Sequence, residues 1–303
     1  MHDHAHGHAH HSHPPINANR AFAIGISLNV AFVLAEVVAG VIADSTALLA
    51  DAAHSLGDVL GLAMAWGATW LARRQRTARR TYGLKRTTIL AGLANAMLIL
   101  FAIGGVTWEA IRRIGDPAPI DGGIVAVVAA IGVLVNGGAA MMFAAGRERD
   151  VNRRGAYLHL MADAAVSAAV VIAGLIVWQT GHTWIDPATS IVVSIVILYG
   201  TIDLLREALD LLLDAVPSHI DPVAVEDYLA KVPNVQAVHD LHIWSMSTTQ
   251  AALTVHLVMP CQASSPTLLR ELEAEIEHRF GIAHTTIQIE PMTGTDGRRC
   301  ASC

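Results

Sequence analysis

The chain has 303 residues, of which 53% are hydrophobic and only 15% are charged, and its mean hydropathy is +0.46. These values exclude an ordinary soluble domain and are typical of a protein that crosses a membrane several times. The net charge of −6 argues against nucleic acid as a partner. Apolar residues are concentrated before about residue 212, so we expect a membrane domain followed by a soluble domain.

The chain begins with a histidine-rich stretch, "MHDHAHGHAHHSHPP", which holds seven of the 16 histidines. A tract of this composition has too few apolar residues to form a core, so residues 1–19 are predicted to be disordered. Such a segment can collect zinc or nickel weakly, in several registers. A tract that serves only solvation would have the same composition.

Six apolar windows of roughly 20 residues, the length of a helix that crosses a bilayer, fall within residues 20–212. They lie near 21–43, 46–71, 88–111, 121–145, 156–180 and 187–209. The first window has no basic stretch before it and no cleavage-like site after it, so we interpret it as a retained span. The sequence therefore predicts an α-helical membrane domain with six transmembrane helices.

Positive charges in the short loops predict the orientation of these helices. The loop after the second window has seven Lys and Arg residues between Arg73 and Arg86, and the loop after the fourth has four between Arg147 and Arg154. Both loops are expected on the cytoplasmic side, which places both termini there too. The basic loop 73–86 is expected to contact anionic lipid headgroups or acidic residues of a partner domain, or only to fix the topology.

Two of the predicted helices carry a histidine and an aspartate four residues apart. His54 and Asp58 lie in "HSLGD", and His159 and Asp163 lie in "HLMAD". Ionisable residues in a span are costly and normally face the bundle interior, and this spacing puts each pair on one helix face. Two imidazoles and two carboxylates suit a tetrahedral zinc ion, and also cobalt or cadmium. The alternative for either pair alone is a hydrogen-bonded contact between helices.

Three further polar residues lie in the predicted spans. Asp51, one turn before His54, is interpreted as a group that supports the ligands or lines an entry cavity, or as a structural hydrogen-bonding residue. The same two interpretations apply to Glu36 and Asn136, and we do not expect either residue to be a ligand.

The soluble part, residues 213–292, reads as an α+β domain. Asp221 followed by Pro222 predicts the start of a helix, and Ser265 followed by Pro266 predicts another. Alternating apolar residues predict two strands between these helices and a third in "HTTIQIEP". The predicted order is therefore α, β, β, α, β.

Several of these segments together resemble one family. They are "LLADAAHSLGD" in the second span, "YGLKR" before the third, "HLMAD" in the fifth, "DPATS" opening the sixth and "VHDLHIW" in the soluble part. The combination, from about residue 20 to 291, is similar to the zinc-transporting branch of the cation diffusion facilitator family. The resemblance implies a homodimeric metal/proton antiporter in a bacterial inner membrane, with a ferredoxin-like cytoplasmic domain at the dimer interface that senses metal.

The same resemblance assigns the ions and their ligands. It implies that His54, Asp58, His159 and Asp163 bind the transported divalent cation. In members that resemble manganese or iron carriers an Asp occupies the position of His54, so the histidine favours zinc. A metal ion and protons compete for these ligands, so zinc from the cytosol is expected to be displaced by protons on the other side.

The soluble part and the tail, residues 293–303, offer a second set of ligands. His239, His242, His256 and His284 lie in or beside the predicted strands, and the tail ends in "CASC". The resemblance implies that such a cysteine pair completes a cytosolic metal site with domain histidines, so we predict a zinc site formed by His239, His256, His284, Cys300 and Cys303. The alternative is a redox-active or metal-scavenging tail. Gln288 and Glu290 replace the His and Asp of some relatives, so a two-metal cluster is not expected.

Two other classes of protein compete with a transporter. An intramembrane metalloenzyme needs an open coordination position and a general base, and no HExxH motif is present, so we do not expect an enzyme. A membrane zinc sensor that binds the ion without moving it needs the same ligands. The duplicated pair within the membrane favours transport.

Overall fold

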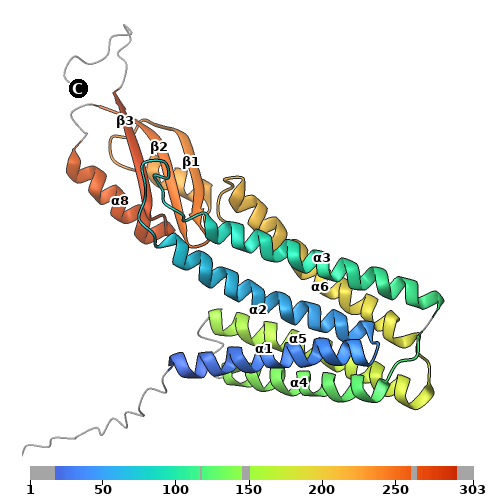
Figure 1. The fold of residues 1–303 in the computed structure, drawn as a ribbon. Coiled ribbons are helices and arrows are strands. Elements are labelled where there is room, and N and C mark those ends of the chain that lie inside the picture. The colour runs from blue at the N-terminus through green and yellow to red at the C-terminus, as the bar shows by residue number, and fades with distance from the viewer. Residues whose placement is uncertain (1–17, 117, 145–150, 261–264, 292–303) are drawn as a thin grey trace, which may run out of the picture. The chain divides into compact units, whose positions relative to one another are not determined.

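The computed structural model describes residues 18–116, 118–144, 151–260 and 265–291, with side chains from residue 30 onward except at 143, 151–153 and 155–156 (Figure 1). The histidine-rich segment, Cys261 and the tail with Cys300 and Cys303 lie outside these ranges. The predictions for them therefore stay predictions.

Long helices make up the first two thirds of the chain. They are α1 (Ala18–Ile42), α2 (Thr46–Ala72), α3 (Thr87–Gly115), α4 (Gly122–Ala144), α5 (Val151–Thr180) and α6 (Ile185–Leu212). Within the described residues, α2 to α6 are long and apolar enough to cross a membrane, and α1 contributes the shorter apolar stretch Val30–Ile42. The predicted windows are thus confirmed as helices, and the chain is an integral membrane protein.

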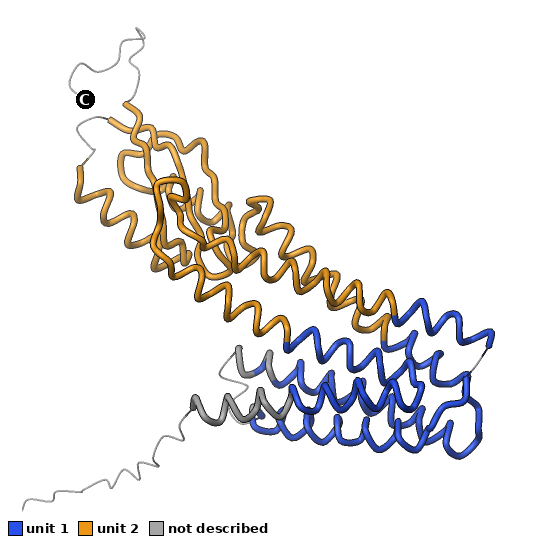
Figure 2. Tube along the Cα trace, viewed as in Figure 1, with its two compact units in different colours: residues 1–59, 106–193 blue, residues 60–105, 194–303 orange. Residues whose placement is uncertain are grey.

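The chain divides into two compact units. Unit 1 contains residues 1–59 and 106–193, and unit 2 contains residues 60–105 and 194–303 (Figure 2). The division falls inside α2, α3 and α6, so neither unit coincides with the segments 20–212 and 213–292 expected from the sequence. Those boundaries stay predictions.

In unit 1 the helices α4 and α5 pack at close range because small residues lie between them. A Cβ atom on Gly122 would meet the carbonyl oxygen of Gly174 at 2.5 Å, and one on Gly174 would meet the backbone nitrogen of Ala126 at 2.8 Å. Any larger residue at these two positions must push the backbones apart. Close backbone approach over small residues is a common way to pack membrane helices.

A buried carboxylate joins the starts of α2 and α6. Asp186 accepts hydrogen bonds from Ser45 Oγ at 2.5 Å, from Thr46 N at 2.7 Å and from Thr46 Oγ1 at 2.9 Å. It also accepts one from Ala47 N at 3.3 Å, so it satisfies free N–H groups in the first turn of α2. Ser190 Oγ completes the junction by donating to Thr46 O at 3.0 Å. The sequence analysis did not detect this cap, because its donor and acceptor lie 140 residues apart in the chain.

The C-terminal part of unit 2 forms a small α/β domain. Its elements are α7 (Pro222–Ala230), β1 (Ala237–Ser247), β2 (Gln250–Met259), α8 (Pro266–Phe280) and β3 (His284–Pro291). The predicted order of helices and strands is confirmed. The strands form one sheet in the order β1-β2-β3, in which β1 and β2 are antiparallel and β2 and β3 are parallel.

Both predicted helix caps are present in this domain. Asp221 accepts a hydrogen bond from Val223 N at 3.0 Å, and Ser265 Oγ accepts one from Leu268 N at 3.1 Å.

The core of the domain takes every second residue of β2, because successive side chains of a strand point to opposite faces. Leu253, Val255 and Leu257 are buried with Leu229 of α7 and Ile276 of α8. The residues between them, such as His256, point to the other face and stay partly exposed. The sheet thus keeps one face for packing and one for polar side chains.

Candidate metal sites

The first candidate site lies within unit 1, between α2 and α5. Nε2 of His54 lies 3.2 Å from Asp163 Oδ1 and 3.8 Å from Asp58 Oδ2. Nε2 of His159 lies 3.5 Å from Asp58 Oδ2 and 3.5 Å from Asp163 Oδ2. Each histidine therefore contacts the aspartate of its own helix and the aspartate of the other helix. The structure brings all four predicted residues together.

The nitrogen–oxygen separations are close to those around a small tetrahedral ion. Zinc holds imidazole nitrogen and carboxylate oxygen at about 2.0 to 2.2 Å, so neighbouring ligand atoms of a tetrahedron are about 3.3 to 3.6 Å apart. The four nitrogen–oxygen separations between 3.2 and 3.8 Å fall close to that range. Ligand atoms of His54, Asp58 and Asp163 also lie within 4.8 Å of one another, whereas His159 is not part of this more compact group.

The four side chains differ in exposure. The side chains of Asp163 and His54 are 12% and 17% exposed, whereas that of Asp58 is 31% and that of His159 is 54% exposed. The site is therefore closed on the side of His54 and open on the side of His159.

Asp51 does not belong to this group of four side chains. Its Oδ2 accepts a hydrogen bond from Ser167 Oγ at 2.8 Å, and the residue is 2% exposed. It therefore forms a buried link between α2 and α5, about one helical turn from His54 on α2 and from Asp163 on α5. Glu36 on α1 is fully buried, and Asn136 on α4 is half-buried.

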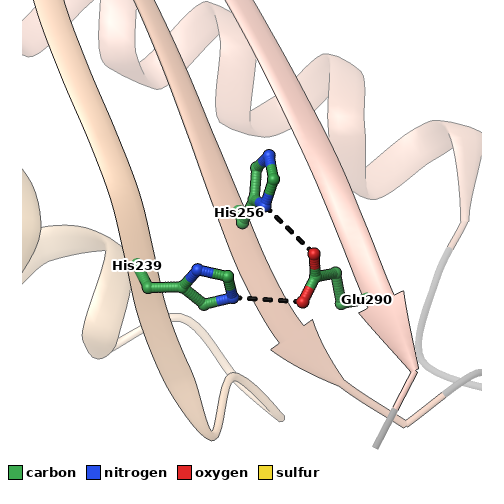
Figure 3. A group of neighbouring side chains, drawn as sticks. All are labelled: His239, His256 and Glu290. Atoms are coloured by element: carbon green, nitrogen blue, oxygen red, sulfur yellow. Dashed lines mark hydrogen bonds and ion pairs between the residues drawn. The ribbon is translucent and has the colours of Figure 1, made fainter.

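The second candidate site lies on the polar face of the sheet in unit 2 (Figure 3). His239 of β1 and His256 of β2 are directly paired, and their ring centroids are 5.2 Å apart. Glu290 of β3 contacts both rings, with Oε2 3.1 Å from His239 Nε2 and Oε1 3.0 Å from His256 Nδ1. Two imidazoles and a carboxylate converge here, which is a donor set that zinc accepts.

The electrostatics of this cluster favour an ionised carboxylate. Desolvation acts to raise the pKa of Glu290, but the hydrogen bond from His239 and the charges of His239 and His256 outweigh it. The pKa of Glu290 is therefore lowered from its ordinary value. An ionised carboxylate is the form that binds a metal ion.

The structure does not bring His284 to this cluster. His284 pairs with Ala252 of β2. It lies six residues before Glu290 on β3, and six residues span about 20 Å along a strand. Its ring instead meets that of Tyr82, at 6.1 Å between centroids. His242 contacts Asp240 at 3.0 Å and is not part of the cluster either.

The sequence analysis did not predict Glu290 as a candidate ligand. The available signal was the alternation along "HTTIQIEP", which puts residues 284, 286, 288 and 290 on one face of the strand. Choosing among them required the register between β2 and β3, and a period-two pattern does not specify the register.

Comparison with known proteins identifies the chain as a membrane transporter of cations. Residues 22–213 match the model of the cation efflux transmembrane domain, and residues 217–292 match that of the cytoplasmic domain of cation efflux proteins. The chain therefore belongs to the cation efflux family, that is, the cation diffusion facilitators. The interpretation as a transporter, and not an enzyme, is confirmed.

Three curated relatives illustrate the similarity. The chain is 37% identical over 282 residues to the metal cation efflux system protein CzcD of Cupriavidus metallidurans, covering 92% of this chain and 89% of the relative. It is 34% identical over 295 residues to the zinc transporter ZitB of Escherichia coli, covering 94% of each. It is 31% identical over 285 residues to the cadmium, cobalt and zinc/H(+)-K(+) antiporter of Bacillus subtilis, covering 92% and 91%. The resemblance to the zinc-transporting branch is thus confirmed, and metal efflux is the shared activity.

Proposed function

We propose that this protein exports zinc from the cytosol in exchange for protons, and that His54, Asp58, His159 and Asp163 bind the transported ion. The observation that carries the proposal is the meeting of two His/Asp pairs from α2 and α5, with nitrogen–oxygen separations of 3.2 to 3.8 Å. The set of two imidazoles and two carboxylates suits zinc and also accepts cadmium or cobalt. The relatives named as zinc transporter and as antiporter support this choice.

Competition between zinc and protons supplies the coupling. Zinc binds neutral imidazole and ionised carboxylate, so binding releases protons and protonation releases zinc. The ordinary pKa of an imidazole, about 6.5, lies near the pH on either side of a membrane, so His54 and His159 suit the role of proton carriers. Alternating access then exposes the same four ligands first to the cytosol and then to the other side.

The remaining architecture follows from the family and the loop charges. We propose six spans with both termini in the cytoplasm, a bacterial inner membrane as the location, and a homodimer that uses a ferredoxin-like cytoplasmic domain. The basic loop 73–86 is proposed to contact lipid headgroups. A second zinc ion is proposed to bind the cytoplasmic domain at His239 and His256, where contacts of 3.0 and 3.1 Å with Glu290 support a regulatory site.

Zinc uptake into proteoliposomes under an imposed pH gradient tests the site. Asp58→Ala and Asp163→Ala are expected to reduce gradient-driven uptake to the level of empty vesicles, because each removes a proposed carboxylate ligand that contacts both histidines. Asp203→Ala is the matched control, since that carboxylate is exposed and contacts only Arg206 at 3.4 Å among the described residues.

The outcomes separate transport from sensing. Uptake by the intact protein and the control, together with loss in both site variants, supports the proposal. Zinc binding without uptake in the intact protein would instead favour a membrane zinc sensor.

A further inference from the structure

His256 of β2 has a carboxylate next to each of its two ring nitrogens. Its Nδ1 lies 3.0 Å from Glu290 Oε1, and its Nε2 lies 3.6 Å from Asp240 Oδ2. A neutral imidazole carries one proton, on one nitrogen or the other, and the nitrogen without the proton is the one that binds a metal ion. The two carboxylates therefore bear on which nitrogen of His256 is the ligand.

Glu290 and Asp240 stand in different relations to the cluster on the sheet face. Glu290 also contacts His239, and these two residues and His256 form the group whose ligand atoms lie within 4.8 Å of one another. Figure 3 shows the ring of His256 with one nitrogen facing Glu290 and the other on the opposite side. A zinc ion bound by this group thus takes Nδ1 of His256, and Nε2 is left facing Asp240.

A bulge in β1 sets the position of Asp240. His239 pairs with His256, and the next paired residue of β1, His242, pairs with Thr254. Three steps along β1 therefore match two along β2, so β1 has one extra residue at this point. Asp240 lies in this bulge with a φ of 55°, in the left-handed region that Asp and Asn adopt more often than other side chains. Bulges redirect side chains in this way beside functional sites.

The same bulge brings a second histidine to Asp240. In a regular strand His239 and His242, three residues apart, would point to opposite faces of the sheet. With the extra residue their partners on β2 are two residues apart, so both histidines lie on one face. His242 Nε2 lies 3.0 Å from Asp240 Oδ1, which leaves Oδ2 of Asp240 to face His256.

Stability alone does not account for this arrangement. The side chains of Asp240 and His242 are exposed, and exposed ion pairs contribute little to the free energy of unfolding. A left-handed backbone at a residue other than glycine carries a cost, and such residues are often found where a ligand is held. The exposed pair therefore does not offset the cost of its own backbone.

We propose that Asp240 is a positioning residue for the zinc ion of the cytoplasmic domain, where it accepts the Nε2 proton of His256 and so keeps Nδ1 free to bind zinc. Histidine ligands commonly donate their second N–H to a carboxylate, which fixes the ring and makes the ligand nitrogen more basic. The present separation of 3.6 Å is longer than a hydrogen bond, so it is expected to shorten when zinc binds. The inference rests on the proposed zinc site at His239, His256 and Glu290, to which it adds a residue that does not touch the ion.

Zinc affinity measured on the full chain tests the role of Asp240. Titration calorimetry compares the intact protein, Asp240→Asn and the control Asp227→Asn, which changes an exposed carboxylate of α7. Asparagine tolerates the left-handed backbone, and its loss of charge is expected to weaken zinc in unit 2 by about 10-fold. The control is expected to match the intact protein. Unchanged zinc affinity in Asp240→Asn would overturn the inference.

Thermal unfolding without zinc separates positioning from a role in the fold. Zinc-free Asp240→Asn is expected to unfold at the same temperature as the zinc-free intact protein, because the exposed pair adds little stability. A loss of zinc affinity accompanied by a lower unfolding temperature without zinc would assign Asp240 to the fold and overturn the inference.

The ring nitrogens of His256 give a measurement that does not depend on how Asp240→Asn folds. In the intact chain labelled with ¹⁵N-histidine, NMR is expected to show zinc on Nδ1 of His256 and a proton on Nε2. The signals of this ring are those that vanish in His256→Gln. Zinc bound through Nε2 would overturn the inference, since Nε2 then has no proton for Asp240. Failure of the proposed zinc site is seen separately, as a Glu290→Gln variant that leaves every class of bound zinc unchanged.

Discussion

The two candidate metal sites use similar side chains in opposite settings. The site in unit 1 places Asp163 and His54 at 12% and 17% exposure between two helices, whereas the cluster in unit 2 lies on an open sheet face with His239 at 47% exposure. A buried charged site is stable only when an ion or protons balance it, so it suits exchange. An exposed cluster can bind or lose an ion without that constraint, which suits regulation.

The largest expected effect is the loss of the site in unit 1. Asp163→Ala removes an oxygen ligand that contacts both histidines. Zinc affinity at this site is therefore expected to fall by more than about 100-fold, which exceeds the usual loss of affinity when a residue that only hydrogen-bonds to a ligand is changed. Titration calorimetry of the intact chain should show two classes of tightly bound zinc besides weak binding to the histidine-rich segment, and the variant should show only one tight class. Two unchanged classes in Asp163→Ala would contradict the assignment.

The next effect concerns the fold of unit 1 and not its ligands. Asp186→Asn replaces the acceptor of four hydrogen bonds at the start of α2 with an amide that accepts on one atom only. The free energy of unfolding is expected to fall by about 1 to 3 kcal/mol, the cost of unsatisfied buried polar groups. Thermal unfolding in detergent measures it, with Asp203→Asn as the exposed control. Equal unfolding temperatures for the two variants would show that the cap is not stabilising.

The third effect concerns the charge of the cluster in unit 2. Glu290→Gln keeps the shape of the side chain but removes the charge between His239 and His256, so zinc bound in unit 2 is expected to weaken by about 10-fold. The class of zinc assigned to unit 1 should keep its affinity. A change in both classes would mean that the sites are not independent.

A smaller effect follows from the lowered pKa of Glu290. The ionised carboxylate stabilises the folded state above its ordinary pKa of 4.5, and this stabilisation is lost as the pH falls through the lower folded value. Below pH 4.5 the intact protein should therefore lose more stability than Glu290→Gln. Unfolding temperatures measured over this range give the comparison. Parallel curves for the two proteins would show that the carboxylate has no such partner in solution.

The smallest effect is expected at His284. Because this residue lies six positions from Glu290 on β3, His284→Ala should change zinc affinity by less than about threefold, well below the cost of losing a ligand. Calorimetry of the full chain, with Cys300 and Cys303 present, decides the matter. A large loss of affinity would support the ligand set predicted from the sequence.

The comparison also shows what a sequence reveals. Helix periodicity is local, so the spacing of His54 and Asp58, repeated in His159 and Asp163, was enough to predict which side chains share a face. The caps Asp221 and Ser265 were predictable for the same reason. Partners distant in the chain were not, because the pairing of β2 with β3 decides that Glu290, and not His284, meets His256. The Asp186 cap likewise depends on packing between helices.

The most direct test of the central claim is the direction of zinc movement when the pH gradient is reversed. Proteoliposomes with the intact protein are loaded with equal zinc on both sides, and net zinc flux is followed after an inward or an outward proton gradient is imposed. An exchanger moves zinc against the proton flow, so the account predicts that the net flux reverses sign with the gradient and vanishes in Asp58→Ala. Zinc movement that is indifferent to the gradient would contradict it.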